Sequence, residues 1–150
     1  MFNKKSNAGL TLPELLMAIL ILVPLFIGAI LTFVKCMEYS AMAKNSSTAI
    51  LASKNRMAQI DNTIYGQVFA NYNSTTFTAA GLNGIGVTYV NNADPNLLDI
   101  TISFCWRERN GRVIGEDKDL DGVLDAGEDT DGDNMIDSLV SLTTKRYNIP

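Results

Sequence analysis

Residues 4–14 read KKSNAGLTLPE, and an uncharged apolar run from Leu15 to Val34 follows directly. The twenty residues of this run can cross a bilayer as one helix, at a rise of about 1.5 Å per residue. Two lysines and no acid precede Thr11, so the positive-inside bias keeps the first residues in the cytoplasm. Glu14 is the exception, because a carboxylate at the start of an apolar run needs a partner. A plain membrane anchor with Glu14 near the interface is the simplest explanation.

The order of Gly9, Thr11, Leu12 and Glu14 resembles the processing site of type IV prepilins and of the related type II secretion pseudopilins. In that family a prepilin peptidase cuts after the glycine, the new N-terminus is methylated, and a Glu is the fifth mature residue. The resemblance implies cleavage between Gly9 and Leu10. It also implies that Glu14 assists assembly by pairing with the N-terminus of a neighbouring subunit. A secretory signal would be cut beyond its apolar region.

Helical character continues beyond the apolar run. Residues 35–64 contain no Pro or Gly and are rich in helix formers. Ile50, Met57, Ile60 and Ile64 share one helical face in this segment. We therefore expect an amphipathic continuation of the helix that buries this stripe against the rest of the chain.

Three strand signals follow a polar segment, residues 66–82, that reads as an irregular connection. They span Ile85–Val90, Leu98–Arg107 and Leu139–Lys145, and the middle one alternates cleanly between apolar and polar residues. The sequence predicts an α+β fold, in which a long N-terminal helix packs on a small antiparallel β-sheet head. The pilin resemblance implies the same architecture.

These expectations divide the chain into four parts with one insertion. They are a leader (1–9), a membrane or filament-assembly helix (10–34), its amphipathic continuation (35–64), and a β head (65–150) with a calcium-loop insertion (115–138).

The insertion concentrates the negative charge of the chain. Residues 115–138 hold ten acids against Lys118 alone, a local charge of −9. The net charge of the chain is −4, so the remainder carries −4 minus −9, or +5. A solvated acidic loop is the simplest explanation of such a segment, but it does not explain the spacing of the acids.

That spacing fits two consecutive calcium loops of the EF-hand pattern, in which Ca²⁺ takes carboxylate and carbonyl oxygens at fixed positions. In the first loop, residues 117–128, the candidate ligands are Asp117, Asp119, Asp121, Asp125, Glu128 and the carbonyl of Val123, with Gly122 at the sharp turn. In the second loop, residues 129–140, they are Asp129, Asp131, Asp133, Asp137 and the carbonyl of Met135.

The second loop departs from the pattern at two positions. Asn134 replaces the turn glycine, and Asn tolerates the left-handed conformation best among the other residues. Val140 replaces the closing glutamate, so this loop is expected to bind more weakly or to borrow a ligand from the first. The spacing of Asp and Gly in this motif also resembles the calcium loops of thrombospondin type 3 and dockerin-like repeats. We expect one Ca²⁺ ion with a second possible, and Mg²⁺ is less suitable because it keeps more waters.

The cysteines leave two alternatives open. Cys36 and Cys105 can form a disulfide that ties the helix to the head, or they can stay as two free thiols. The chain has no His and none of the usual catalytic motifs, so it is not expected to be an enzyme. Its scattered basic residues do not predict a nucleic-acid site.

Together these features predict a pilin-like subunit of a type IV pilus or related filament. The resemblance implies an inner-membrane precursor with a periplasmic head, whose partners are the prepilin peptidase, the membrane and other pilin or pseudopilin subunits. After assembly it would belong to a pilus or pseudopilus, in the periplasm or at the cell surface. Two alternatives stay open: a minor pseudopilin of type II secretion, and a membrane-tethered calcium-binding adhesin that never polymerises.

Overall fold

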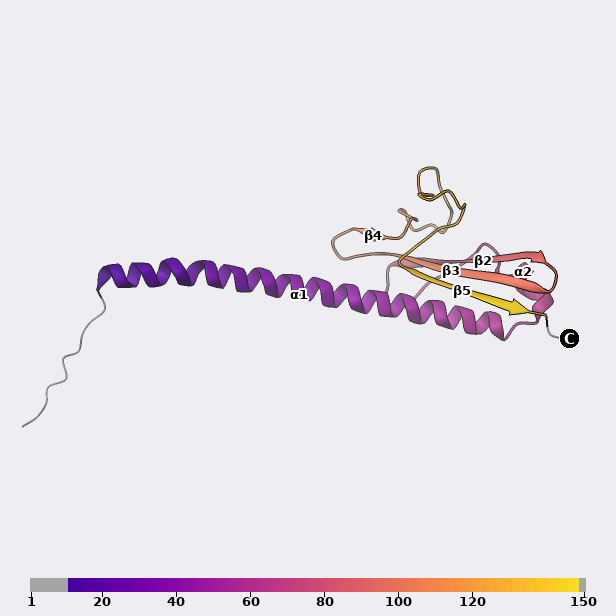
Figure 1. Ribbon diagram of the computed structural model, residues 1–150, viewed down its shortest axis with the longest axis horizontal. Coiled ribbons are helices and arrows are strands. Elements are labelled where there is room, and N and C mark those ends of the chain that lie inside the picture. The colour runs from indigo at the N-terminus through magenta and orange to yellow at the C-terminus, as the bar shows by residue number, and fades with distance from the viewer. Residues whose placement is uncertain (1–10, 149–150) are drawn as a thin grey trace, which may run out of the picture. The chain divides into compact units, whose positions relative to one another are not determined.

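The computed structural model describes residues 11–148, so the expected cleavage site at Gly9 and Leu10 lies outside it. Its elements, in chain order, are α1 (Leu12–Asp61), α2 (Tyr65–Tyr72), β1 (Thr75–Phe77), β2 (Gly84–Asp94), β3 (Leu97–Arg107), β4 (Val113–Ile114) and β5 (Val140–Tyr147) (Figure 1). The chain divides after Ala41 into two units. We call the second unit, from Met42 onward, the head.

The first unit is the N-terminal part of α1. Thr11 and Glu14 have the Thr-x-x-Glu spacing of a capping box, and the Thr11 hydroxyl lies 3.5 Å from a carboxylate oxygen of Glu14. A negative charge in the first turn of a helix is favourable, so Glu14 has a local structural role whatever else it does. The helix continues through Pro24 without ending.

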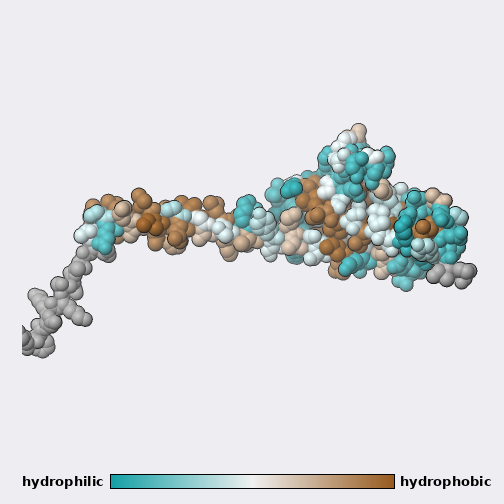
Figure 2. Space-filling view, in the orientation of Figure 1, coloured by the Kyte–Doolittle hydropathy of each residue, from teal (hydrophilic) through white to brown (hydrophobic). Residues whose placement is uncertain are grey.

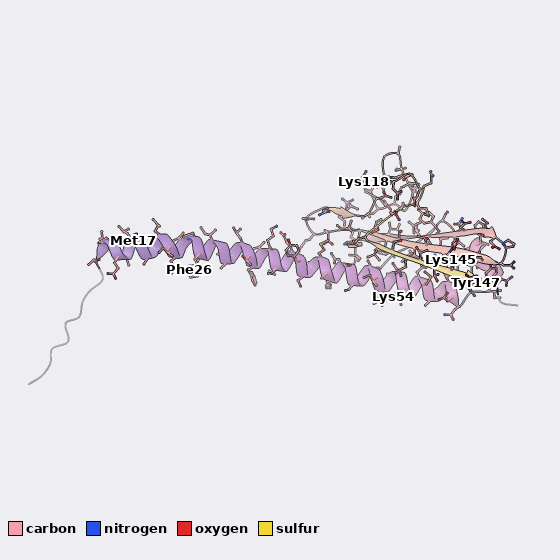
Figure 3. The ribbon with its side chains drawn as sticks, in the orientation of Figure 1. Met17, Phe26, Lys54, Lys118, Lys145 and Tyr147 are labelled. Carbon is pink, nitrogen blue, oxygen red and sulfur yellow. The ribbon has the colours of Figure 1, made fainter. Side chains whose placement is uncertain are left out.

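This part of α1 is apolar on all sides. Met17 and Phe26 are 66% and 56% exposed and stand outward from the helix (Figure 3). The brown surface in Figure 2 covers the same part of the helix. Within the described residues, α1 is the one helix long and apolar enough to span a membrane, and the apolar stretch is not buried by the rest of the chain.

The head contains an antiparallel sheet, which confirms the expected α+β fold. β1 pairs with β2 and β2 pairs with β3. The other edge of β3 is shared by two strands, because β4 pairs with Trp106 and Arg107 and β5 pairs with the residues from Leu97 to Phe104. The insertion therefore interrupts one edge of the sheet, between β4 and β5.

The inner face of the sheet carries the main core. Ile100, Ile102, Phe104 and Trp106 alternate along β3 and are fully buried, in two clusters that also contain buried residues of α1. The alternation in the sequence predicted this face correctly.

The contact face of α1 differs from the predicted stripe. Ile60 is buried and Met57 packs beside it, but Ile50 is 37% exposed and Ile64 lies beyond the end of α1, 71% exposed. The fully buried residues nearer the middle of α1 are Ala49 and Ser53, both small, and Ala49 packs in one cluster with Phe104 and Trp106 of β3. A search for large apolar residues does not detect such a face.

The predicted irregular connection over residues 66–82 was also wrong in part. It contains most of α2 and all of β1. Val68 of α2 is fully buried beside Ile60, and the ring of Phe77 in β1 lies 5.6 Å from that of Phe104. Both elements are short, so they show too few repeats for a periodic pattern to be recognised.

Candidate metal centre

The insertion preserves the register of the sheet edge that it interrupts. Trp106 pairs with Ile114 in β4, and Phe104 pairs with Val140 in β5. A step of two residues on β3 thus corresponds to 26 residues on the returning chain, which is 24 more than a continuous strand needs. This excess equals two 12-residue loops and the length of residues 115–138. Two whole loops are therefore inserted without shifting any strand residue to the opposite face.

The two ends of the insertion are joined at its base. The Glu116 N–H donates to the Asp137 carbonyl at 2.8 Å, and the Asp137 N–H donates to Oε2 of Glu116 at 3.0 Å. The Ser138 hydroxyl then donates to the Phe104 carbonyl at 2.6 Å, which fixes the insertion to β3. As predicted, the acidic segment lies between strands rather than between two helices; β4 and β5 pair in succession with the same edge of β3.

Asp117 organises the first loop. Its side chain is fully buried and accepts hydrogen bonds from the backbone N–H groups of Leu120 at 2.6 Å and Gly122 at 2.8 Å. Gly122 has a φ of 81°, as the turn position requires. A Cβ there would lie only 2.5 Å from Thr76 Cγ2, so this position also needs glycine for its close approach to the sheet.

Glu128 closes the first loop with both carboxylate oxygens. Oε1 accepts a hydrogen bond from the Lys118 N–H at 2.7 Å, and Oε2 accepts one from the Asp125 N–H at 3.1 Å. These donors stand at positions two and nine of the loop. The Lys118 ammonium, labelled in Figure 3, also donates to the Gly127 carbonyl at 2.6 Å.

The second loop repeats the backbone of the first. Asp129 accepts from the N–H groups of Gly132 at 2.6 Å and Asn134 at 3.2 Å, at the positions that Leu120 and Gly122 occupy in the first loop. Asn134 has a φ of 62°, which confirms the expectation that it replaces the turn glycine in a left-handed conformation. The sequence repeat is thus a structural repeat.

Glu116 takes the place of the glutamate that the second loop lacks. Its Oε1 accepts a hydrogen bond from the Thr130 N–H at 2.9 Å, and its Oε2 accepts the bond from Asp137. Thr130 and Asp137 are positions two and nine of the second loop, the same positions that Glu128 contacts in the first. Sequence reasoning missed Glu116 because it precedes the first loop. The available signal was its place twelve residues before Glu128.

The carboxylates are spaced for a cation. Three groups each place one oxygen per residue within 4.8 Å of one another, and they are Asp117, Asp119 and Glu128; Asp119, Asp121 and Asp125; and Asp129, Asp131 and Asp133. Two oxygens on one Ca²⁺ ion lie at most about 5.2 Å apart, twice the longest usual Ca–O distance. The residues present therefore fit hard cations with oxygen ligands.

The ionisation of the acids reflects this crowding. Burial raises the pKa of Asp117. Burial, together with the negative charges of Asp133, Asp131, Glu116 and Asp129, raises the pKa of Asp137. Burial also raises the pKa of Glu116, but the hydrogen bonds from Thr130 and Asp137 outweigh it and hold this pKa below its usual value. A bound cation would relieve the mutual repulsion of these carboxylates.

The remaining candidate residues do not join this cluster. Cys36 is exposed and Cys105 is buried, and both are free thiols, which is the second of the two alternatives. Val123 is 58% exposed and Met135 is half-buried, and only their backbone carbonyls were predicted as ligands. Glu14 lies in the first unit, on α1.

Comparisons with protein-family models, with curated proteins and with solved structures found no match to this chain.

Proposed function

We propose that this chain is a pilin-like subunit of a type IV pilus or related filament, made as an inner-membrane precursor and cleaved after Gly9. The observation that supports this most strongly is the N-terminal part of α1, an exposed apolar helix that begins with Glu14 in its first turn. Such a helix needs an apolar surrounding, and either a bilayer or a bundle of identical helices provides one.

Assembly would give Glu14 its second role. In a filament core its carboxylate would leave water, and a positively charged N-terminus of a neighbouring subunit would compensate for the loss of hydration. Removal of one partner from such a buried pair is costly, so Glu14→Ala should block assembly while the protein still accumulates in the membrane.

The test of this proposal is the intact mass of the protein from cells that contain a functional prepilin peptidase. A product that begins at Leu10 and carries one added methyl group supports the proposal. A Gly9→Val variant, which should stay uncut, is the matched control. If the protein keeps its intact N-terminus at Met1, the filament proposal is wrong, and a tethered calcium-binding protein becomes the better assignment.

The head of this subunit would bind Ca²⁺ at the insertion. Five carboxylates of the first loop would hold one ion. In the second loop, Asp129, Asp131, Asp133 and Asp137 would hold another, with Glu116 as the closing carboxylate. The cation would supply positive charge that permits the acids to come together. Ion binding would then be linked to folding of the insertion.

Calorimetry of the full chain in detergent, with CaCl₂ and with MgCl₂ as titrants, tests this part. Extracellular calcium modules bind with dissociation constants of about 10⁻⁴–10⁻³ M. A tenfold excess of Ca²⁺ over the dissociation constant would stabilise the head by about 1.4 kcal/mol. The double variant Asp117→Asn, Asp129→Asn should lose the heat of binding. Equal binding of Mg²⁺ would contradict a calcium site.

A further inference from the structure

The insertion packs on the outer face of the sheet, opposite the face that α1 covers. Cys105 alternates with Phe104 and Trp106 along β3, so it points to this outer face. There it forms a small apolar cluster with Val87 of β2 and Ile136 of the insertion, each at most 2% exposed.

Each loop of the insertion contributes to this packing. Leu120 and Leu124 of the first loop and Ile136 of the second lie against the outer-face cluster. The Tyr89 hydroxyl on β2 accepts a hydrogen bond from the Ile136 N–H at 2.9 Å. A Cβ on Gly122 would lie 2.5 Å from Thr76 and 3.1 Å from Ile85, two further outer-face residues, so this turn lies close to the sheet.

When no cation is bound, the insertion is held by this packing and by a few hydrogen bonds to β3, among them those from Ser138 to the Phe104 carbonyl and from Arg107 to the Lys118 carbonyl. Among the described residues of the insertion, Ile136 is the one fully buried apolar side chain, whereas ten acids repel one another. The inner face is different, because α1 covers it with two clusters of buried apolar residues, and the buried acids among the described residues, Asp117 and Glu128, both belong to the insertion. The two faces of one sheet therefore depend on different forces.

We propose that the insertion is a cation-held cover: Ca²⁺ keeps it on the outer face, and loss of Ca²⁺ releases it and exposes the apolar cluster around Cys105. The inner face and the sheet itself stay folded in both states. This inference depends on the proposed calcium binding, because the bound cation would offset the repulsion among the acids that opposes this packing. Beyond calcium binding itself, the proposal predicts that the outer face of the sheet is reversibly covered and exposed at calcium concentrations near the dissociation constant.

The Cys105 thiol reports directly on this change. The full chain carrying Cys36→Ser, in detergent, has Cys105 as its one thiol. Its reaction with a thiol reagent such as DTNB is measured at constant pH, in CaCl₂ and in EGTA. A closed cover should slow the reaction by about tenfold or more in CaCl₂, because the thiol reacts only from the open state.

A matched reporter on the inner face separates local opening from global unfolding. Ser53 is fully buried on α1 and its hydroxyl has no hydrogen-bond partner, so replacement by Cys breaks no hydrogen bond. The variant Cys36→Ser, Cys105→Ser, Ser53→Cys should react slowly in both buffers. A deletion of residues 115–138, which preserves the register of the sheet edge, should leave Cys105 reactive in both buffers.

The outcomes distinguish the cover from the calcium proposal. Calcium-dependent protection of Cys105 with constant protection at position 53 supports the cover. If calorimetry detects Ca²⁺ binding but the reactivity of Cys105 does not change, the cover is wrong and calcium binding stands. Parallel changes at both positions would mean global folding and overturn the local cover. Absence of Ca²⁺ binding would overturn both proposals.

Discussion

The two loops of the insertion have the same backbone but close in different ways. The first is closed by Glu128, which belongs to the loop itself. The second is closed by Glu116, which precedes the first loop and contacts Thr130 and Asp137 only because the insertion folds back on its base. Closure is local in the first loop and depends on tertiary structure in the second.

Because the two loops close differently, Ca²⁺ binding by each loop should respond differently to changes in the surrounding sheet. The first loop needs only its own twelve residues to assemble its ligands. The second needs the paired ends of the insertion, and hence the sheet edge that β4 and β5 share. The first loop should therefore bind the tighter ion. Anything that loosens the sheet edge should affect the second ion first.

The largest effect on Ca²⁺ affinity should come from Glu128→Gln. Glutamine keeps the length of the side chain but loses the negative charge and one acceptor oxygen. We expect the tighter Ca²⁺ affinity to fall about 100-fold, which equals about 2.7 kcal/mol. Calorimetry with CaCl₂ measures this change. If both ions weakened equally, the loops would be coupled and the assignment of Glu128 to the first loop alone would be wrong.

Glu116→Gln should weaken the second ion by about tenfold, or about 1.4 kcal/mol, and leave the first nearly unchanged. The effect is smaller because Glu116 is half-buried whereas Glu128 is only 6% exposed, so solvent compensates more of the lost charge. A calorimetric titration that resolves two ions separates the two outcomes. The structural equivalence of Glu116 and Glu128 would be contradicted if this variant weakened the tighter ion instead.

The local features of this site could be predicted from the sequence, but the long-range contact that closes the second loop could not. The acids at odd positions and the turn residues Gly122 and Asn134 follow a pattern that stands in the sequence itself. Glu116 could not be assigned in the same way, because its contact with Thr130 crosses fourteen residues and depends on pairing at the base of the insertion. The alternation in β3 predicted the inner face for the same local reason.

The residues that cover the two faces of the sheet could not be predicted from the sequence either. Ala49 and Ser53 are fully buried on α1 although neither has a large apolar side chain, so hydrophobicity alone does not identify them. The outer-face cluster around Cys105 joins residues of β2, β3 and the insertion. Neither feature has a periodic signal in the sequence.

A reciprocal exchange at the turn position compares the loops directly. Asn134→Gly should stabilise the head slightly, by about 0.5 kcal/mol, because glycine adopts the left-handed conformation without strain. Gly122→Asn should destabilise it by about 1–3 kcal/mol, because the new side chain would meet Thr76 and Ile85. Urea denaturation in CaCl₂ measures both changes. Equal and opposite effects would show that close approach to the sheet is unimportant at position 122.

The last comparison concerns the pH dependence of stability in the absence of cations. Burial raises the pKa of Asp117 in the first loop and, with negative neighbours, that of Asp137 in the second, so the folded state holds these protons more tightly than the unfolded state. Their contribution to stability is therefore present below the ordinary pKa of 3.8 and is lost as the pH rises through the folded pKa values. The lowered pKa of Glu116 acts in the opposite direction, above its ordinary value of 4.5.

Urea denaturation in EGTA at a series of pH values measures this balance. Asp117→Asn and Asp137→Asn should each flatten the profile, by less than about 1.4 kcal/mol per pH unit, the limit for one linked proton. In CaCl₂ the slope of the parent should reverse, because protons compete with Ca²⁺ for the same oxygens and stability then falls as the pH is lowered. A profile with the same sign in EGTA and in CaCl₂ would mean that these carboxylates do not bind the ion. A change in the sign of the pH dependence between EGTA and CaCl₂ would therefore show that the carboxylates that titrate are the ones that bind the ion and close the loops.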